Sequence, residues 1–196
     1  MLDILLIGAG GHAAACIDVI EAENRFKIIG LLGDKSEVGT DVCGYQVIGT
    51  DEDLPQLRKL CKHALVAVGQ LECAKLRIDL YEQAKAQNFV LPSVVAPTAV
   101  LSKTANMGEG SILMHGVVVN SRAVIGRNCI INTKALVEHD AIIGNHSHIS
   151  TGVIINGSTE IGYGCFVGSG SVLKNGISIG HDSIIPMGSV LKANPD

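Results

Sequence analysis

The chain has 196 residues, a formal net charge of −4, 47% hydrophobic residues and only 17% charged ones. This composition excludes a disordered chain, and a weakly acidic balance without a basic block gives no electrostatic basis for binding nucleic acid. No apolar run reaches the ~18 residues of a membrane-spanning helix, so we expect no membrane span. Six cysteines without a Cys-x-x-Cys pair, and an N-terminus without a basic signal region, indicate buried free thiols and a cytoplasmic protein.

Residues 1 to 90 alternate between strand-like and helix-like patterns. Strands are expected at 3–7, 27–32 and 64–68, and helices at 11–23, 51–61 and 71–87. Asp51 is a plausible cap for the second of these helices. Such alternation is typical of a parallel sheet with helical crossovers.

A glycine-rich segment, Gly8-Ala-Gly-Gly-His-Ala13, connects the first predicted strand to the first predicted helix. It fits the pattern G-x-G-x-x-A, which places phosphate groups at the N-terminus of the helix. Asp34, at the end of the second strand, is placed to meet a ribose or a base. Residues 1–90 are therefore predicted to form a small Rossmann-like domain. Its length, half of a full dinucleotide fold, favours one nucleotide, such as a UDP-sugar, over NAD.

From Val95 onward the sequence follows a period of six. Every sixth residue from Val95 to Leu191 is aliphatic, and the residue four positions later is of valine size or smaller, except Ile177. Two such registers over nearly a hundred residues are the signature of a parallel β-helix. Three six-residue faces close one triangular coil of about eighteen residues, and neighbouring coils pair as parallel strands ~4.8 Å apart.

Glycines also recur every eighteen residues in this region. They are Gly108, Gly126, Gly144, Gly162 and Gly180. This spacing predicts one corner repeated up the prism, where glycine fits unusual backbone angles. No insertion interrupts the hexads, so residues 91–196 are predicted to form about five regular coils.

Several motifs occur together along the whole chain. They are Gly8-Ala-Gly-Gly-His12, Leu31-Leu-Gly-Asp34, Ala67-Val-Gly-Gln70, the hexads, and Val137-Glu-His-Asp140 followed by His146-Ser-His148. In combination they resemble the bacterial sugar acyltransferases that carry a hexapeptide-repeat, left-handed β-helix. The most similar branch N-acetylates UDP-4-amino-sugars of bacillosamine-type pathways, and a neighbouring branch O-acetylates sialic acids. The left hand of the helix and a homotrimer with active sites between subunits are implied by this resemblance.

The resemblance also implies catalytic roles. Acetyl-CoA donates its acetyl group directly to the sugar amine, and His139 is the general base that takes the amine's proton. Asp140 fixes the tautomer of the imidazole, at a place where relatives often carry Glu. The N–H of Gly157, which is one coil away from His139, binds the acetyl oxygen and stabilises the oxyanion.

Binding roles follow from the same resemblance. His148 lines the acetyl-CoA cleft, and Met187 aligns with a second backbone donor where relatives usually carry glycine. His12 donates to a phosphate or to the sugar, and Gln70 stands where relatives often have Asn. The residues expected to bind the sugar nucleotide are Gly8, Gly10, Gly11, His12, Asp34, Gly69 and Gln70.

His146 and His148 flank the inward-facing Ser147, so both are expected to point outward. No third ligand of suitable spacing accompanies them, so no metal site is expected. Three alternatives to amine acetylation stay open. The same His139 could serve O-acetylation of a sugar hydroxyl, or the chain could be a non-catalytic sugar-nucleotide-binding protein or an NAD-binding module.

Overall fold

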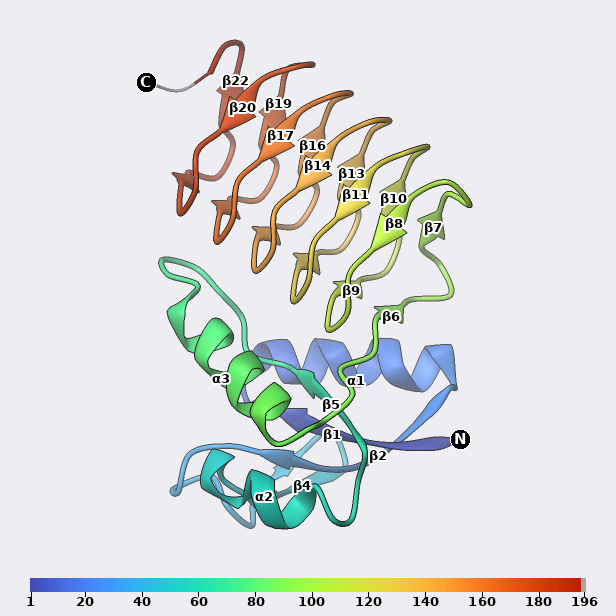
Figure 1. The fold of residues 1–196 in the computed structure, drawn as a ribbon, viewed down its shortest axis with the longest axis vertical. Coiled ribbons are helices and arrows are strands. Elements are labelled where there is room, and N and C mark those ends of the chain that lie inside the picture. The colour runs from blue at the N-terminus through green and yellow to red at the C-terminus, as the bar shows by residue number, and fades with distance from the viewer. Residues whose placement is uncertain (195–196) are drawn as a thin grey trace. The chain divides into compact units, whose positions relative to one another are not determined.

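The computed structural model describes residues 1–194, and the chain separates into two compact units (Figure 1). The first unit comprises Met1–Gly69 and Lys75–Val94. The second comprises Gln70–Ala74 and the chain from Val95 onward. The segment 70–74, which the sequence assigned largely to a helix, therefore belongs by its contacts to the repeat unit.

The N-terminal unit holds a five-stranded sheet in the order β3-β4-β2-β1-β5. Its strands are β1 (Leu2–Ile7), β2 (Phe26–Leu32), β3 (Asp41–Val42), β4 (Tyr45–Gly49) and β5 (His63–Val66). β1 pairs in parallel with β2 and β5, β4 is parallel to β2, and β3 is an antiparallel edge strand. Because β1 lies between two parallel strands, its last four residues are all buried and apolar. This arrangement confirms the Rossmann-like expectation.

The helices of this unit are α1 (Gly11–Glu23), the 3₁₀ turn η1 (Asp51–Asp53), α2 (Leu54–Leu57) and α3 (Lys75–Ala86). α1 has the predicted bounds, but the predicted helix 51–61 is shorter. Thr50, rather than Asp51, caps it, because the Asp53 carboxylate accepts the Thr50 N–H at 2.9 Å. After Leu57 the N–H groups of Lys59 and Leu60 bond three residues back, which tightens the chain into turns and ends the helix.

The core of the N-terminal unit lies between its sheet and α3. Leu80, Tyr81 and Ala84 of α3 are buried in one cluster with Leu5 and Ile7 of β1. α1 buries a separate set of small and aliphatic side chains, among them Ala13, Cys16, Ile17, Val19 and Ile20. The packing of both helices fixes the carboxyl ends of the strands, where a ligand cleft is expected in this fold.

The repeat unit consists of three parallel sheets whose short strands stack coil upon coil (Figure 1). The first sheet contains β7 (Val100–Leu101), β10 (Val118–Val119), β13 (Leu136–Val137), β16 (Ile154–Ile155), β19 (Val172–Leu173) and β22 (Val190–Leu191). The second contains β8 (Asn106–Met107), β11 (Val124–Ile125), β14 (Ile142–Ile143), β17 (Glu160–Ile161) and β20 (Ser178–Ile179). The third contains β6 (Val94–Val95), β9 (Ile112–Leu113), β12 (Ile130–Ile131), β15 (His148–Ile149), β18 (Phe166–Val167) and β21 (Ile184–Ile185).

The pairing register equals one coil. Val118 lies opposite Leu136, which lies opposite Ile154, so each coil takes eighteen residues, as the sequence predicted. The predicted fold class, a Rossmann-like domain followed along the chain by a left-handed parallel β-helix, is confirmed. Two residues eighteen apart are therefore neighbours in successive coils, and this relation governs the site described below.

Both hexad registers point into the prism. The large aliphatic residues of the central coils are buried, namely Leu113, Val119, Ile125, Ile131, Val137, Ile143, Ile149, Ile155, Ile161, Val167, Leu173, Ile179 and Ile185. The small register is buried as well, and its hydroxyls find partners. Ser111 donates to the Gly126 carbonyl at 2.7 Å, and Ser147 donates to the Gly162 carbonyl at 2.9 Å. The interior thus satisfies its polar groups through the next coil.

The recurring glycines have a different cause from the predicted one. None of the five has a left-handed φ. The left-handed φ angles occur instead at every sixth residue from Gly110 to Gly188, and most of these residues are Gly, Asn or Asp. A Cβ atom on Gly144 would lie only 2.5 Å from the carbonyl carbon and oxygen of Gly162. A Cβ on Gly108, Gly126 or Gly162 would lie 2.6 to 2.7 Å from the backbone of the next coil, while a Cβ on Gly180 would meet nothing nearer than 3.7 Å. Glycine is required here by the close approach of coils.

We expect Gly144→Ala to lower the free energy of unfolding by about 1–3 kcal/mol or more, since the added methyl group overlaps backbone that cannot rotate away. Urea unfolding followed by circular dichroism measures the effect. Gly180→Ala is the matched control, because its Cβ has room and its φ is not left-handed. Equal stability of the two variants would contradict the coil-contact explanation.

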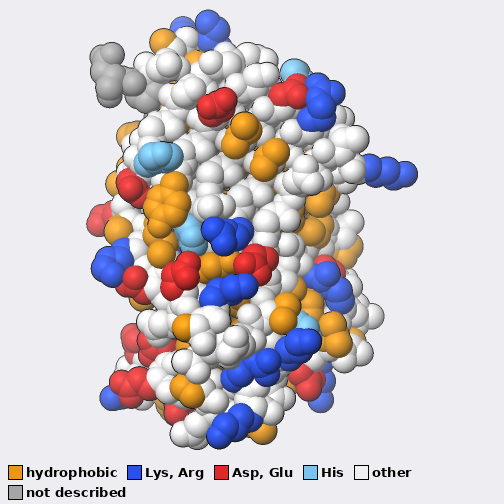
Figure 2. All heavy atoms as spheres, in the orientation of Figure 1, with side chains coloured by type: hydrophobic (Ala, Val, Ile, Leu, Met, Phe, Trp, Pro, Cys, Tyr) orange, Lys and Arg blue, Asp and Glu red, His pale blue; other side chains and the backbone are white. Residues whose placement is uncertain are grey.

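The surface offers no simple charge pattern on the face shown in Figure 2, where acidic and basic side chains are interspersed with apolar ones. Within the described part of the chain, no helix is both long and apolar enough to cross a membrane. Among residues 1–194, no group of three or more His, Cys, Asp or Glu is arranged to hold a metal ion.

Candidate active site

One corner of the prism carries the three predicted catalytic residues. His139 and Asp140 follow β13, and Gly157 follows β16 one coil later. The Ser158 N–H donates to the His139 carbonyl at 2.9 Å, which ties the two coils together at this point. The eighteen-residue spacing thus places Gly157 next to His139, as the sequence predicted.

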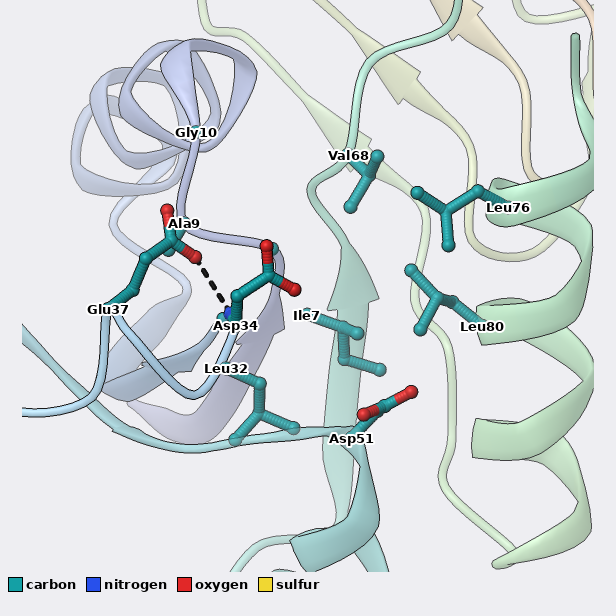
Figure 3. A pocket seen from close by; sticks show the side chains of 12 residues that line it. Ile7, Ala9, Gly10, Leu32, Asp34, Glu37, Asp51, Val68, Leu76 and Leu80 are labelled. Atoms are coloured by element: carbon teal, nitrogen blue, oxygen red, sulfur yellow. Dashed lines mark hydrogen bonds between the residues drawn. The ribbon is translucent and has the colours of Figure 1, made fainter.

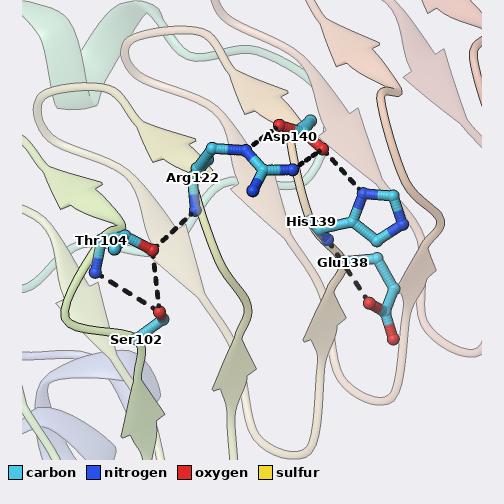
Figure 4. Close-up of polar contacts among 6 residues, drawn as sticks. All are labelled: Ser102, Thr104, Arg122, Glu138, His139 and Asp140. Atoms are coloured by element: carbon cyan, nitrogen blue, oxygen red, sulfur yellow. Dashed lines mark hydrogen bonds and ion pairs between the residues drawn. The ribbon is translucent and has the colours of Figure 1, made fainter.

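The imidazole of His139 is oriented by its neighbour in sequence. Its Nδ1 lies 2.8 Å from Oδ2 of Asp140 (Figure 4). A carboxylate only accepts hydrogen bonds, so the neutral imidazole carries its hydrogen on Nδ1 and keeps its lone pair on Nε2. The His139 side chain is 54% exposed, so Nε2 is able to meet a substrate.

Asp140 is in turn held by Arg122, a residue that the sequence analysis did not single out. Nε of Arg122 lies 2.6 Å from Oδ1 of Asp140, and Nη2 lies 2.8 Å from Oδ2. The guanidinium, and to a lesser extent the His139 hydrogen bond, hold the pKa of the Asp140 carboxyl well below its usual range. Asp140 is therefore an anion at any pH at which His139 can act as a base. The opposite charges eighteen residues apart were the signal in the sequence.

Gly157 lies directly against the imidazole. A Cβ atom on Gly157 would stand 2.7 Å from Cε1 and 2.8 Å from Nε2 of His139, so the ring occupies the space that any larger residue would fill. The Gly157 N–H donates to no acceptor within residues 1–194, and it remains available as a hydrogen-bond donor. A free donor beside a free base is the pairing that acyl transfer needs.

His146 and His148 lie outside the prism interior, as expected, but both are buried rather than solvated. His148 Nδ1 lies 2.8 Å from the Gln70 carbonyl oxygen, and its Nε2 lies 3.2 Å from Nδ2 of Asn132. His146 packs edge-on against Tyr163. Each ring is therefore part of the packing between coils.

The structure does not bring Met187 to the His139 corner within one chain. Met187 follows β21 of the third sheet, whereas His139 follows β13 of the first sheet. Gln70 belongs by its contacts to the repeat unit. Its side chain is buried and its Nε2 donates to the carbonyls of Gly164 at 3.1 Å and Cys165 at 3.3 Å.

The N-terminal unit carries a cleft of about 270 Å³ at the carboxyl ends of β1, β2 and β5 (Figure 3). Three predicted residues line it, namely Gly8, Gly10 and Asp34. Gly10 is also the N-cap residue of α1, so the positive end of the helix dipole opens onto the cleft. A Cβ on Gly8, which has φ +126°, would lie 2.7 Å from Cγ2 of Val68, so the turn admits only glycine.

The lining of this cleft was only partly predicted. Its apolar walls come from Ile7, Leu32, Val68, Leu76 and Leu80, and two further carboxylates come from Glu37 and Asp51. Carboxylates on apolar walls suit a flat ring that presents hydrogen-bond donors. The sequence identified Asp34 because it ends a strand, whereas Asp51 and Leu76 reach the cleft through tertiary packing alone.

Glu37 and Asp34 have different tasks. The Glu37 carboxylate accepts the backbone N–H of Asp34 at 2.8 Å, which fixes the loop after β2. The Asp34 side chain points into the cleft (Figure 3). Of the other predicted residues, His12 and Gly69 face each other, with a Cβ on Gly69 only 3.6 Å from Cβ of His12. Gly11 begins α1 and does not line the cleft.

Comparison with protein families places both units. Residues 3–84 match the family described as the PglD N-terminal domain, and residues 159–193 match the hexapeptide repeat of succinyl-transferase. Among curated proteins, UDP-N-acetylbacillosamine N-acetyltransferase of Bacillus subtilis (strain 168) is 31% identical over 116 residues. That alignment covers 58% of this chain and 52% of the relative, which is about half of its length.

Solved structures match over nearly the whole chain. PerB from Caulobacter crescentus, in complex with CoA and GDP-perosamine, is 32% identical with a TM-score of 0.92, and the match covers 98% of this chain and 89% of that one. The acetyltransferase domain of PglB from Neisseria gonorrhoeae is 30% identical with a TM-score of 0.90, over 100% of this chain and 94% of that one.

A Rossmann-like unit with an acidic cleft, followed along the chain by a parallel β-helix with a histidine–carboxylate pair on its corner, defines a hexapeptide-repeat acyltransferase. The chain belongs to the bacterial sugar acyltransferase family of the PglD and PerB type. The resemblance read from the sequence motifs is thereby confirmed.

Proposed function

We propose that the protein transfers the acetyl group of acetyl-CoA to the amine of a nucleotide-linked 4-amino-sugar, with His139 as the general base. The observation that carries this proposal is the geometry of one corner. His139 Nδ1 is bound to Asp140 at 2.8 Å, which leaves Nε2 free beside the unpartnered N–H of Gly157. Relatives named as N-acetyltransferases of UDP- and GDP-linked amino sugars support the substrate class.

The proposed reaction has two steps. The neutral amine attacks the thioester carbonyl carbon, a C–N bond forms, and Nε2 of His139 takes the proton that the nitrogen loses. The Gly157 N–H donates to the oxygen that becomes negative in the tetrahedral intermediate. The C–S bond then breaks, and the CoA thiolate leaves with the proton returned by His139. The products are the amide and free CoA, and no further reactant is needed.

The sugar nucleotide is proposed to bind through the cleft of the N-terminal unit. The start of α1 at Gly10 and Gly11 suits the phosphates, and Asp34 suits the hydroxyls or the base. His12, Gly69 and Gln70 remain proposed contacts. The named relatives include both a UDP-linked and a GDP-linked substrate, and we propose UDP as the nucleotide to test first.

Assembly and the acetyl-CoA site belong to the same proposal. His139 is half exposed on a prism corner, so a second copy of the chain would supply the wall that encloses the acetyl group. The two proposed acetyl-CoA contacts Gly157 and Met187 lie at different corners, which also suits a site shared between copies. His148 is proposed to line the same acetyl-CoA cleft. We therefore propose a homotrimer, which light scattering after size exclusion tests directly. A cytoplasmic location remains part of the proposal, in keeping with six cysteines that form no disulfide. Four of them are buried as expected, whereas Cys43 and Cys73 are exposed.

The deciding experiment is thiol release from acetyl-CoA, followed with DTNB, in the presence of UDP-4-amino-4,6-dideoxy-N-acetylglucosamine. Fast release with formation of the amide supports the proposal, and GDP-perosamine in the same assay shows whether the sugar nucleotide bound by the relative PerB is also accepted. Release with sugar hydroxyls but not with amines would replace it by O-acetylation. Binding of sugar nucleotides without any release would indicate a non-catalytic binding protein.

We expect Asp34→Asn to weaken binding of the sugar nucleotide about tenfold, because a neutral amide replaces a charged acceptor in the cleft. Calorimetric titration with UDP-sugar measures the effect, and the affinity for acetyl-CoA should not change. Asp18→Asn on the exposed side of α1 is the matched control. Unchanged sugar-nucleotide affinity in the Asp34 variant would remove this residue from the site.

A further inference from the structure

A column of polar residues runs along the corner that carries His139. Thr104, Arg122 and Asp140 are spaced by eighteen residues and so occupy the same position in three successive coils. The backbone N–H of Arg122 donates to Oγ1 of Thr104 at 3.2 Å, and the Arg122 guanidinium binds Asp140 in the next coil (Figure 4). Arg122 and Asp140 both have a left-handed φ of 60°, so their side chains leave the corner in the same way.

The Arg122 guanidinium grips both oxygens of the Asp140 carboxylate. Nε binds Oδ1 at 2.6 Å and Nη2 binds Oδ2 at 2.8 Å, and Oδ2 also accepts from Nδ1 of His139. The carbon–carboxylate torsion of an aspartate is broad and has no single preferred value. A two-point grip by a planar guanidinium removes that freedom.

We propose that Arg122 is a positioning residue for catalysis, which keeps the Asp140 carboxylate in the orientation that accepts the Nδ1–H of His139. The inference rests on the proposed role of His139 as the base. Asp140 is adjacent in sequence to His139 and has a short side chain, so a small rotation of its carboxylate would break the 2.8 Å contact. Without the contact the imidazole would turn or change tautomer, and Nε2 would lose its lone pair or its direction.

The charges around the imidazole are few. On its own corner, Asp140 faces Nδ1, and the Glu138 carboxylate lies 3.4 Å from the backbone N of His139 and accepts from Asn120 at 3.0 Å. Arg122 is the charged group on the preceding coil. On the following coils, Gly157 and Asn175 are uncharged. Removal of the Arg122 guanidinium therefore removes the cation that binds the Asp140 carboxylate beside the ring.

The test compares Arg122→Gln and Arg122→Lys with Arg127→Gln, an exposed arginine on another corner. We expect Arg122→Gln to lower kcat roughly tenfold to a hundredfold while KM for both substrates stays within about twofold. Arg122→Lys keeps the charge but cannot bind both carboxylate oxygens in the same way, so its kcat should lie between those of Arg122→Gln and the native chain. The kcat of Arg127→Gln should match that of the native chain.

A readout without turnover separates this inference from the proposed function. Nitrogen-15 NMR of the His139 ring should show one tautomer, protonated at Nδ1, in the native chain and a mixture in Arg122→Gln, even if no acceptor sugar is acetylated. If the native chain showed no acetyl transfer, the proposed function would be overturned, but the positioning role of Arg122 would still be tested by the tautomer. An unchanged tautomer together with unchanged kcat in Arg122→Gln would overturn the positioning role, as would a loss of kcat explained wholly by a lower melting temperature.

Discussion

We expect His139→Ala to lower kcat for acetyl transfer by about 10²–10⁴-fold, because the amine then has no positioned group to take its proton. The fold should be unaffected, since the side chain is 54% exposed and its loss opens no cavity in the prism. Binding of acetyl-CoA and of the sugar nucleotide should stay near native values. Steady-state rates of thiol release, with urea unfolding as a check on folding, measure both expectations.

The matched control for this variant is His181→Ala. His181 also lies exposed on a corner of the prism, where it accepts the Tyr163 N–H at 2.9 Å, but it follows β20 of the second sheet. Its loss should leave kcat unchanged. A native rate in His139→Ala would show that another group carries the proton, and equal losses in both variants would point to a general effect on the prism.

The rate of acetyl transfer should also depend on the Asp140 carboxylate that contacts the ring. Asp140→Asn turns an acceptor into a group that can donate, so the imidazole would be held in the wrong tautomer or released. The pKa of Asp140 lies well below its usual range because Arg122 and then His139 bind the anion. Asp140 is therefore charged throughout the working range, so a loss of rate at mildly acidic pH would not come from protonation of this carboxylate.

The prism could be predicted from sequence because its period is strict. Each inward position admits one class of side chain, so seventeen aliphatic residues in step reveal both the coil length and the pairing of strands. Once a coil is known to take eighteen residues, contacts between coils can be read from the numbering. His139 and Gly157 were paired in this way, and Arg122 and Asp140 could have been.

Features set by distances rather than by periods were not predicted. The residues around Gly144 do not reveal that a Cβ atom there would lie 2.5 Å from the backbone of the next coil. The sequence therefore suggested unusual backbone angles for these glycines, which was the wrong explanation. The β3–β4 hairpin was missed, although Cys43 and Gly44, with φ of 51° and 87°, make the tight turn between two strands that are short and partly exposed. Such strands carry too little alternation to be recognised.

The two binding regions differ in the same respect. Gly8 and Asp34 were found because phosphate turns and strand ends have local signatures. Asp51 and Leu80 line the same cleft only because the sheet order brings β4, β5 and α3 around it. Gln70 shows the opposite case. Its sequence motif suggested the nucleotide end, but its amide is hydrogen-bonded to backbone carbonyls of the prism.

We expect Gly157→Ala to lower kcat by about a hundredfold or more. The methyl carbon would stand 2.7 Å from Cε1 and 2.8 Å from Nε2 of His139, closer than atoms can approach, and 3.2 Å from Nδ2 of Asn175. The imidazole is the movable partner, so the fold survives while the ring swings away from Asp140. Native-like unfolding together with a low rate of thiol release is the expected signature, and Gly180→Ala, whose Cβ has room, should retain native kcat.

A double-mutant cycle decides whether the glycine acts through the histidine. If the added methyl group harms catalysis by displacing the ring, Gly157→Ala should lower kcat little further once His139 is already alanine. The effects of the two substitutions on the activation free energy should then be far from additive. Additive losses would instead show that the methyl group acts on the substrate or on the Gly157 N–H itself. Both outcomes keep Gly157 at the site, but only the first assigns its lack of a side chain to the space that the base requires.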